Sequence, residues 1–244
     1  MLSFVQTDDP VADARLHTQL IHRHIAWINA LRVQLRQPKS WAIQETRSVE
    51  RMFDRHGERN IACNEAYNFV SKREFIGLKD RVNPATHLVK NQGLQVSQLR
   101  KDHIIDGFQE DQLQSVLEEL YNLQGKCERI KNTPFPRQFA YFSKVFTWVF
   151  VLLIPFGLLN IFQEHGTEHM EQWMVFLMIP FAVLVMWIFT TMEIVGDNSE
   201  DPFEGRINDV PMTALCRTIE IDLRDMLDED DLPVGIEPKD NILY

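Results

Sequence analysis

Two apolar stretches decide the fold: residues 145–163, VFTWVFVLLIPFGLLNIFQ, and residues 172–192, QWMVFLMIPFAVLVMWIFTTM. Neither stretch contains Asp, Glu, Lys or Arg, and each is long enough as a helix to cross the hydrocarbon of a bilayer. A helix of this length in a soluble protein keeps one polar face toward water, and these stretches have none. The sequence therefore predicts a transmembrane helical hairpin over residues 135–195.

The charges that flank the hairpin predict its orientation. Basic residues beside membrane helices tend to stay on the cytoplasmic side. The loop between the two stretches, residues 164–171, has no Lys or Arg. We therefore expect this loop outside and both termini in the cytoplasm, because five basic residues precede or open the first stretch: Lys126, Arg129, Lys131, Arg137 and Lys144.

Composition excludes several function classes. The chain has 25 basic and 35 acidic residues, a formal charge of −10, which argues against a nucleic-acid partner and against polybasic attachment to anionic lipid. Its three cysteines lie far apart, so neither a disulfide framework nor a zinc site is indicated. No catalytic motif or glycine-rich phosphate loop occurs in the sequence. We expect no metal, no cofactor and no enzymatic activity.

Outside the hairpin the apolar residues recur at helical spacing and no strand pattern stands out. We expect helices over residues 11–36, 84–103, 108–131 and 212–227, with Asp209 as the N-cap of the last. This gives an all-α membrane protein with a cytosolic helical region (1–134), the hairpin (135–195) and a cytosolic C-terminal loop and helix (196–244).

Two of these helices carry an apolar stripe at helical spacing. In the last helix, Leu215, Ile219, Leu223 and Met226 repeat at steps of four, four and three. In the helix over residues 108–131, the predicted buried stripe is Leu113, Val116, Leu117, Leu120, Leu123 and Cys127. A subunit with two spans has few ways to cover this stripe, so we expect it to contact neighbouring subunits; the alternative is that it packs entirely against the chain's own helix over residues 16–35.

Short motifs on both sides of the hairpin resemble the bacterial branch of the bestrophin family. Before and within the first span these are KCERIKNTPFP at residues 126–136 and LIPFG at 153–157. After the second span they are DPF at 201–203, NDVPM at 208–212 and CRTIEIDL at 216–223. The similarity extends over essentially the whole chain, and it implies a bestrophin-like fold.

The resemblance implies a homopentameric ion channel of the bacterial inner membrane, with a long axial pore. Its partners would be the lipid bilayer, further copies of the chain and the permeating ions. Eukaryotic relatives are calcium-activated chloride channels, and bacterial relatives can prefer cations. The family also has two further membrane segments ahead of the region that matches here, and this sequence starts after them. The alternatives are therefore a truncated channel fragment or a non-conducting membrane-tethered scaffold.

In eukaryotic members an acidic cluster after the last membrane helix helps to clasp calcium, an ion that takes six to eight oxygen ligands. The matching stretch here contains Glu204, Asn208 and Asp209 together with a positive charge at Arg206. We regard it as a degenerate version of the clasp. The expected role is a capped loop before the last helix, without calcium gating.

The family's cytosolic constriction comes just ahead of a Leu-Gln-Ser sequence, which here is Leu113-Gln114-Ser115. The resemblance places Asp111 at the constriction, with Glu110 and Gln112 beside it. Five copies around one axis would form a ring of carboxylates, which attracts cations. A shift of register would place Gln109 or Gln112 there instead.

Overall fold

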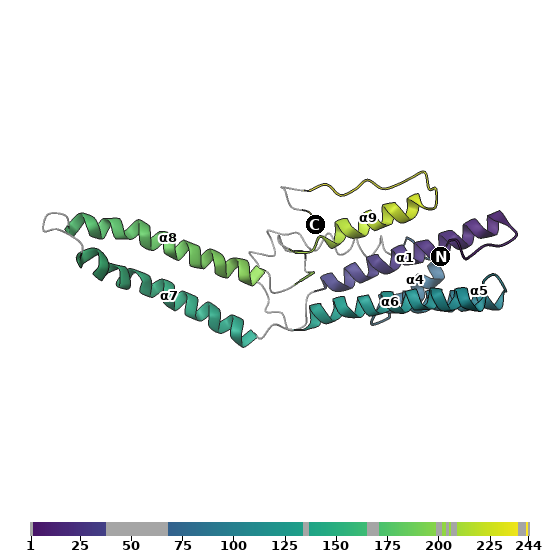
Figure 1. Ribbon diagram of the computed structural model, residues 1–244, viewed down its shortest axis with the longest axis horizontal. Helices are drawn as coiled ribbons and strands as arrows, with labels where there is room; N and C mark the ends of the chain where they lie inside the picture. Colours follow the sequence, from purple (N-terminus) through teal and green to yellow (C-terminus); the bar gives the residue numbers. More distant parts are fainter. Residues whose placement is uncertain are drawn as a thin grey trace. The chain divides into compact units, whose positions relative to one another are not determined.

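The computed structural model describes residues 2–37, 68–133, 137–164, 171–198, 202, 203, 205, 209–238 and 243. The described residues form helices and connecting segments without strands, which confirms the predicted all-α class. Two compact units result, residues 1–132 with 203–244 and residues 133–202. Figure 1 shows the helices α1 (Pro10–Arg36), α4 (Lys72–Lys79), α5 (Pro84–Lys101), α6 (Gly107–Asn132), α7 (Arg137–Glu164), α8 (Glu171–Asn198) and α9 (Met212–Asp225).

Helix α1 is the centre of the first unit, and it confirms the predicted helix over residues 11–36. The Asp9 side chain accepts a hydrogen bond from the Val11 amide at 3.0 Å, and Pro10 occupies the first turn, where its missing N–H costs nothing. Helices α5, α6 and α9 all contact α1, so nearly every residue from Leu20 to Arg32 is buried.

The core of this unit consists of two groups of side chains along α1. One group surrounds Trp27 and Leu31 and includes Leu88 of α5 and Cys216 of α9. The other joins Leu20 to α5 and to the first half of α6 through Val96, Leu99, Ile105, Leu113 and Leu117. Burial of these apolar surfaces provides the main drive for packing the helices of this unit.

Two predicted stripes differ from the observed ones. In α6, Leu113 and Leu117 are buried, but Val116 and Leu123 are 52% and 44% exposed. In α9, Ala214, Cys216 and Glu220 are buried, whereas the side chains of Leu215, Ile219 and Met226 are exposed. The small side chains of Ala214 and Cys216 let α9 lie close to α1, and the apolar repeat of α9 is left largely exposed.

The second unit contains the predicted hairpin, formed by α7 and α8. The two helices pack on each other, with Ile154 and Ala182 buried and with Phe150 and Phe189 in edge contact at 4.7 Å between ring centres. Each helix contains one proline, Pro155 in α7 and Pro180 in α8.

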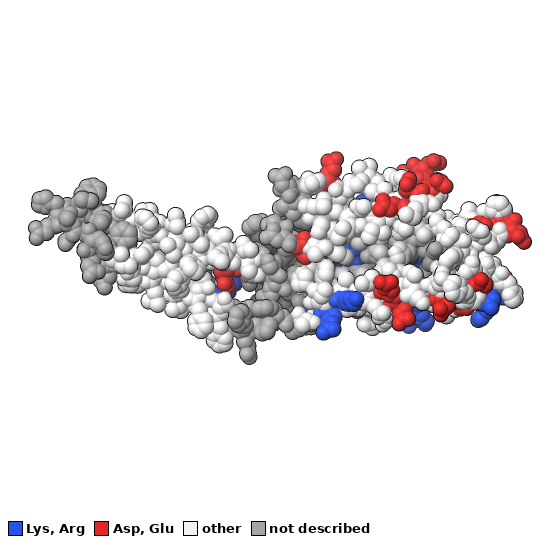
Figure 2. All heavy atoms as spheres, viewed as in Figure 1, with Lys and Arg blue, Asp and Glu red and all other residues white. Residues whose placement is uncertain are grey.

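Nearly all other apolar side chains of the hairpin point outward. The segments Tyr141–Leu159 and Phe176–Gly196 are long and apolar enough to cross a membrane, and only 6% of each is buried. The core helix of a soluble protein is mostly buried. These two segments are mostly exposed, so they do not resemble such a core helix. Each contains a single charged residue, Lys144 or Glu193, and Figure 2 shows the hairpin's described surface largely uncharged, with charge near one end.

A network of ionic side chains fastens the end of α9 to α1. Glu220, which is buried, pairs with Arg217 at 3.0 Å and with Arg224 at 3.5 Å. Arg224 Nε donates to Glu229 at 2.6 Å, and the other oxygen of Glu229 lies 2.6 Å from His22 Nε2 on α1. Burial by itself would raise the pKa of Glu229, but the hydrogen bonds from Arg224 and His22 outweigh it and lower the pKa below its usual value.

The lowered pKa of Glu229 predicts a pH dependence of stability. Because the folded-state pKa lies below that of the unfolded chain, the stabilisation is present above the usual carboxyl pKa and is lost as pH falls through the folded value. Glu229→Gln should lower the apparent Tm by a few degrees at neutral pH. The difference in Tm from the unmodified protein should narrow as pH falls from the ordinary carboxyl pKa through the lower folded-state pKa, as measured by circular dichroism in detergent. Asp230→Asn, the matched control at an exposed position, should leave the profile unchanged; a constant gap across this range would contradict the assignment.

Candidate functional site

The first turn of α6 carries the residues that the constriction motif singles out. Its start is held by a reciprocal capping box. The Asp106 side chain accepts from the Gln109 amide at 2.7 Å, and the Gln109 side chain accepts from the Asp106 amide at 2.9 Å. The Gln109 side chain is therefore committed to the helix start.

Glu110 is also engaged within the chain. Its carboxylate accepts a hydrogen bond from the Ser97 hydroxyl of α5 at 2.9 Å, and the side chain is half-buried. Gln114, one turn further along α6, donates to the Gly93 carbonyl at 3.0 Å and to Ser97 Oγ at 3.3 Å. This side of the helix start thus packs against α5.

Asp111 and Gln112 are different, because both are exposed and neither makes a hydrogen bond or ion pair with the described residues. Asp111 lies two positions before the buried Leu113, which corresponds to about 200° around the helix. It therefore projects from the side of α6 opposite the core. Among the four candidates of the helix start, Asp111 and Gln112 are the two whose side chains remain available to an ion or to another subunit.

The surface of α6 has two distinct exposed sides. The side opposite the core is polar and consists of Asp111, Ser115, Glu118 and Asn122. Beside the core-facing side lies an apolar flank, formed by Val116, Leu123 and Ile130, which are 52%, 44% and 55% exposed. Sequence reasoning placed Val116 and Leu123 in one stripe with Leu113 and Leu117 and expected the whole stripe to contact a neighbouring subunit. The structure instead buries Leu113 and Leu117 in the chain's own core and leaves Val116 and Leu123 exposed.

The loop before α9 is organised by Asp209. One carboxylate oxygen accepts from the Phe203 amide and the other from the Gly205 amide, each at 2.8 Å. Phe203 has a positive φ of 69°, which is costly for a residue other than glycine and needs such support, whereas glycine adopts the φ of 79° at Gly205 readily. The expected N-cap role is wrong, because α9 begins after Pro211 without a side-chain cap.

These bonds determine what the loop offers an ion. Both oxygens of Asp209 already hold backbone amides, while Glu204 and Asn208, the other two residues of the degenerate clasp, lie outside the described residues. No group of three or more His, Cys, Asp or Glu side chains in the described part of the chain is placed to hold a metal. That the loop does not gate by calcium stays a prediction.

The two described cysteines, Cys127 and Cys216, have little thiolate character. Burial raises the pKa of Cys216 to about 11 against the opposing charges of Arg32 and Arg36. Burial and the neighbouring Glu128 raise the pKa of Cys127 as well. Because the thiolate is the reactive and metal-binding form, these thiols act as core side chains.

Known proteins resemble this chain, with its exposed apolar hairpin and its helical unit. A family model described as bacterial/fungal bestrophin protein matches residues 1–225. The chain belongs to the bestrophin family. This confirms the resemblance seen in the motifs around the hairpin.

The curated relatives of this bestrophin are named voltage-dependent anion channel-forming proteins. YneE of Salmonella typhi is 33% identical over 122 residues, covering 50% of this chain and 36% of the relative. YneE of Escherichia coli (strain K12) is 34% identical over 113 residues, covering 46% and 33%. The matched part of the chain thus spans about a third of the length of these relatives.

Solved bestrophin structures show the same fold. The crystal structure of a bacterial bestrophin homolog from Klebsiella pneumoniae aligns with a TM-score of 0.69 at 20% identity and covers 91% of this chain and 70% of that one. A structure described as a membrane protein with the substitution L259A gives a TM-score of 0.70 at 20% identity. At this level of identity the likeness establishes the architecture of the family for this chain.

Proposed function

We propose that the chain is a subunit of a bestrophin-like oligomeric ion channel that carries ions passively across the bacterial inner membrane. The observation that carries this proposal is the family match over residues 1–225 in a chain whose hairpin exposes two apolar spans. The relatives named as anion channel-forming proteins support the same activity. The described cysteines, with their raised pKa values, offer no activated nucleophile for an alternative enzymatic role.

The competing proposal is a membrane-tethered scaffold whose helical unit binds another protein and through which no ion passes. Single-channel recording in planar bilayers separates the two. The recording should include the full chain and a version extended at its N-terminus by the first membrane segments of a bacterial bestrophin. Discrete currents in either preparation support the channel, whereas silence in both supports the scaffold.

The proposed orientation places both termini in the cytoplasm and the loop over residues 164–171 outside. It is supported by the basic residues ahead of the first span and by the absence of Lys and Arg from the loop. A cysteine introduced at Thr167 should react with a membrane-impermeant reagent in intact cells, and one introduced at Asn241 should react after lysis. The opposite labelling pattern would reverse the orientation.

We propose that the apolar flank of α6 contacts a neighbouring subunit in a homopentamer. Three exposed apolar side chains on one side of a helix cost free energy in water and are typical of an interaction surface. The polar side, with Asp111 and Glu118, lies on a different face of the helix. In a ring of identical subunits, the side of a helix that meets the neighbour differs from the side that faces the axis, so this division suits such an assembly.

Leu123 provides the test of this interface. Leu123→Asp should shift the detergent-solubilised assembly to smaller species, because it places a charge in the apolar contact. Asn122→Asp, the matched control on the polar side, should leave the mass unchanged by light scattering. The neighbouring Leu117 is unsuitable for this test, since it is buried in the chain's own core. An unchanged mass for Leu123→Asp would remove the flank from the interface.

Within this assembly Asp111 is the proposed determinant of ion preference, with Gln112 beside it and Glu110 behind it. A ring of up to five Asp111 carboxylates attracts cations and repels anions. Its exposure and lack of an internal partner support this role. The names of the curated relatives indicate anions instead, so ion preference is the property in which this chain is proposed to differ from them.

Reversal potentials under a salt gradient test the Asp111 ring. Asp111→Asn should lower the permeability ratio of cation to chloride several-fold, because it removes the ring charge without changing its size. Asp225→Asn, a control at an exposed position on α9, should leave the ratio unchanged. If both variants behave like the unmodified channel, Asp111 does not line the pathway.

A further inference from the structure

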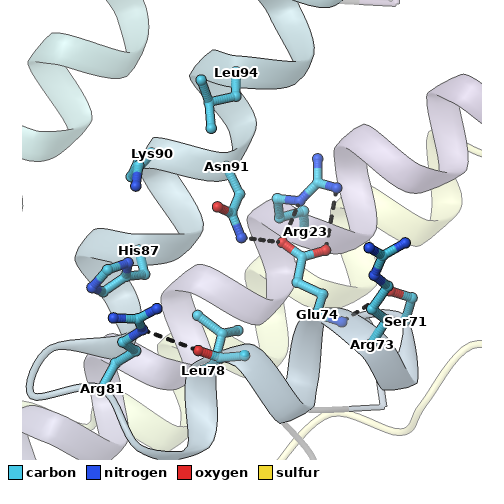
Figure 3. Close-up of a pocket in the computed structure, with 11 residues that line it drawn as sticks. Arg23, Ser71, Arg73, Glu74, Leu78, Arg81, His87, Lys90, Asn91 and Leu94 are labelled. Carbon is cyan, nitrogen blue, oxygen red and sulfur yellow. Dashed lines mark hydrogen bonds and ion pairs between the residues drawn. The ribbon is translucent and has the colours of Figure 1, made fainter.

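A basic pocket lies in the helical unit, away from the start of α6. It has a volume of about 450 Å³ and is bounded by α4, the first half of α5 and Arg23 of α1. Figure 3 shows Arg81 and His87 toward one end of the pocket and Arg73 and Ser71 toward the other, with Glu74 between them. Lys90, Asn91 and Leu94 line it from α5.

The wall of this pocket is built around one ion pair. Arg23, which is only 6% exposed, donates from Nε to Glu74 Oε1 at 2.9 Å and from Nη2 to Glu74 Oε2 at 3.2 Å. Its remaining nitrogen, Nη1, donates to Gln92 and Gln95 of α5. Asn91 donates to Glu74 Oε1 at 2.8 Å. Both oxygens of Glu74 are therefore hydrogen-bonded, and Arg23 balances its charge.

Three further cations line the pocket: Arg73, Arg81 and Lys90. None of them forms an ion pair with a described acidic side chain. Arg81 is held in position because its Nε donates to the Gly77 carbonyl at 3.2 Å. Residues 71–94 contain five Lys or Arg and two Asp or Glu, in a chain whose net charge is −10. The pocket is thus a local excess of positive charge in an acidic protein.

We propose that this pocket binds a soluble, phosphate-bearing small molecule with two or three negative charges. The charges of Arg73, Arg81 and Lys90 sum to +3, since those of Arg23 and Glu74 cancel. Guanidinium groups bind phosphate oxygens through two parallel hydrogen bonds, and a lysine ammonium supplies a point charge. The volume lies in the range of small-molecule sites, and the exposed Leu94 offers apolar surface to the organic part of the ligand.

A lipid headgroup carries the same phosphate chemistry, and the experiment must separate the two sources. Inorganic pyrophosphate serves as the soluble probe, and short-chain dihexanoyl phosphatidic acid serves as the lipid probe. Binding of each to the full chain in detergent is measured by isothermal titration calorimetry at low ionic strength. This equilibrium measurement does not depend on whether the protein conducts ions, so it stands apart from the proposed function.

Charge removal inside and outside the pocket provides the decisive comparison. Arg73→Gln and Lys90→Gln should each weaken pyrophosphate binding about tenfold, the value of one charge-assisted hydrogen bond. Lys101→Gln, the matched control on α5, removes the same charge at an exposed position outside the pocket and should bind as tightly as the unmodified protein. Unchanged circular dichroism spectra show that the variants fold.

Three results would overturn the proposal. The first is no binding of pyrophosphate by the unmodified chain at millimolar concentration. The second is an equal loss of affinity in Lys101→Gln and Lys90→Gln, which indicates attraction to general surface charge. The third is binding of the phosphatidic acid alone, lost in Lys90→Gln, which assigns the pocket to a lipid headgroup.

Discussion

The helical unit depends on the side-chain amide of Gln124, which is 1% exposed and lies where three helices meet. Its oxygen accepts from Trp27 Nε1 of α1 at 2.8 Å, and its nitrogen donates to Thr86 Oγ1 of α5 at 2.9 Å and to Glu128 Oε1 of α6 at 2.8 Å. A buried amide without partners costs free energy, so these contacts restrict how α6 can rotate against α1 and α5. That rotation determines which side of α6 faces the core, and therefore that Asp111 projects away from it while Val116 and Leu123 form a flank.

The sequence predicts the helices of this protein well because their signals are local. The two charge-free spans and the helical patterns over residues 11–36 and 84–103 depend on neighbouring residues, and the structure has a helix at each of these four places. The side of a helix that becomes buried depends on partners that are remote in the chain. In α9 the side with the apolar repeat stays largely exposed, whereas the side with Ala214, Cys216 and the ion-paired Glu220 is buried.

The candidate site was predictable in position but not in detail. The Leu-Gln-Ser motif points to the start of α6, yet it does not distinguish Gln109, Glu110, Asp111 and Gln112. The capping box with Asp106 and the hydrogen bond to Ser97 make this distinction, and both depend on the geometry of the turn between α5 and α6. Asp209 illustrates the same limit. The sequence predicts it as the N-cap of α9, but in the structure its carboxylate accepts hydrogen bonds from the amides of Phe203 and Gly205 instead.

The two proposed ionic sites follow from where this acidic chain places unpaired charges. Among the described residues, the buried Arg23 and Glu220 are paired with Glu74 and Arg217, because an unpaired charge in the core is too costly. An unpartnered charge is therefore tolerated at the surface, where water or a ligand can solvate it. Asp111 on α6 and the cations at Arg73, Arg81 and Lys90 are such positions, and they carry opposite signs.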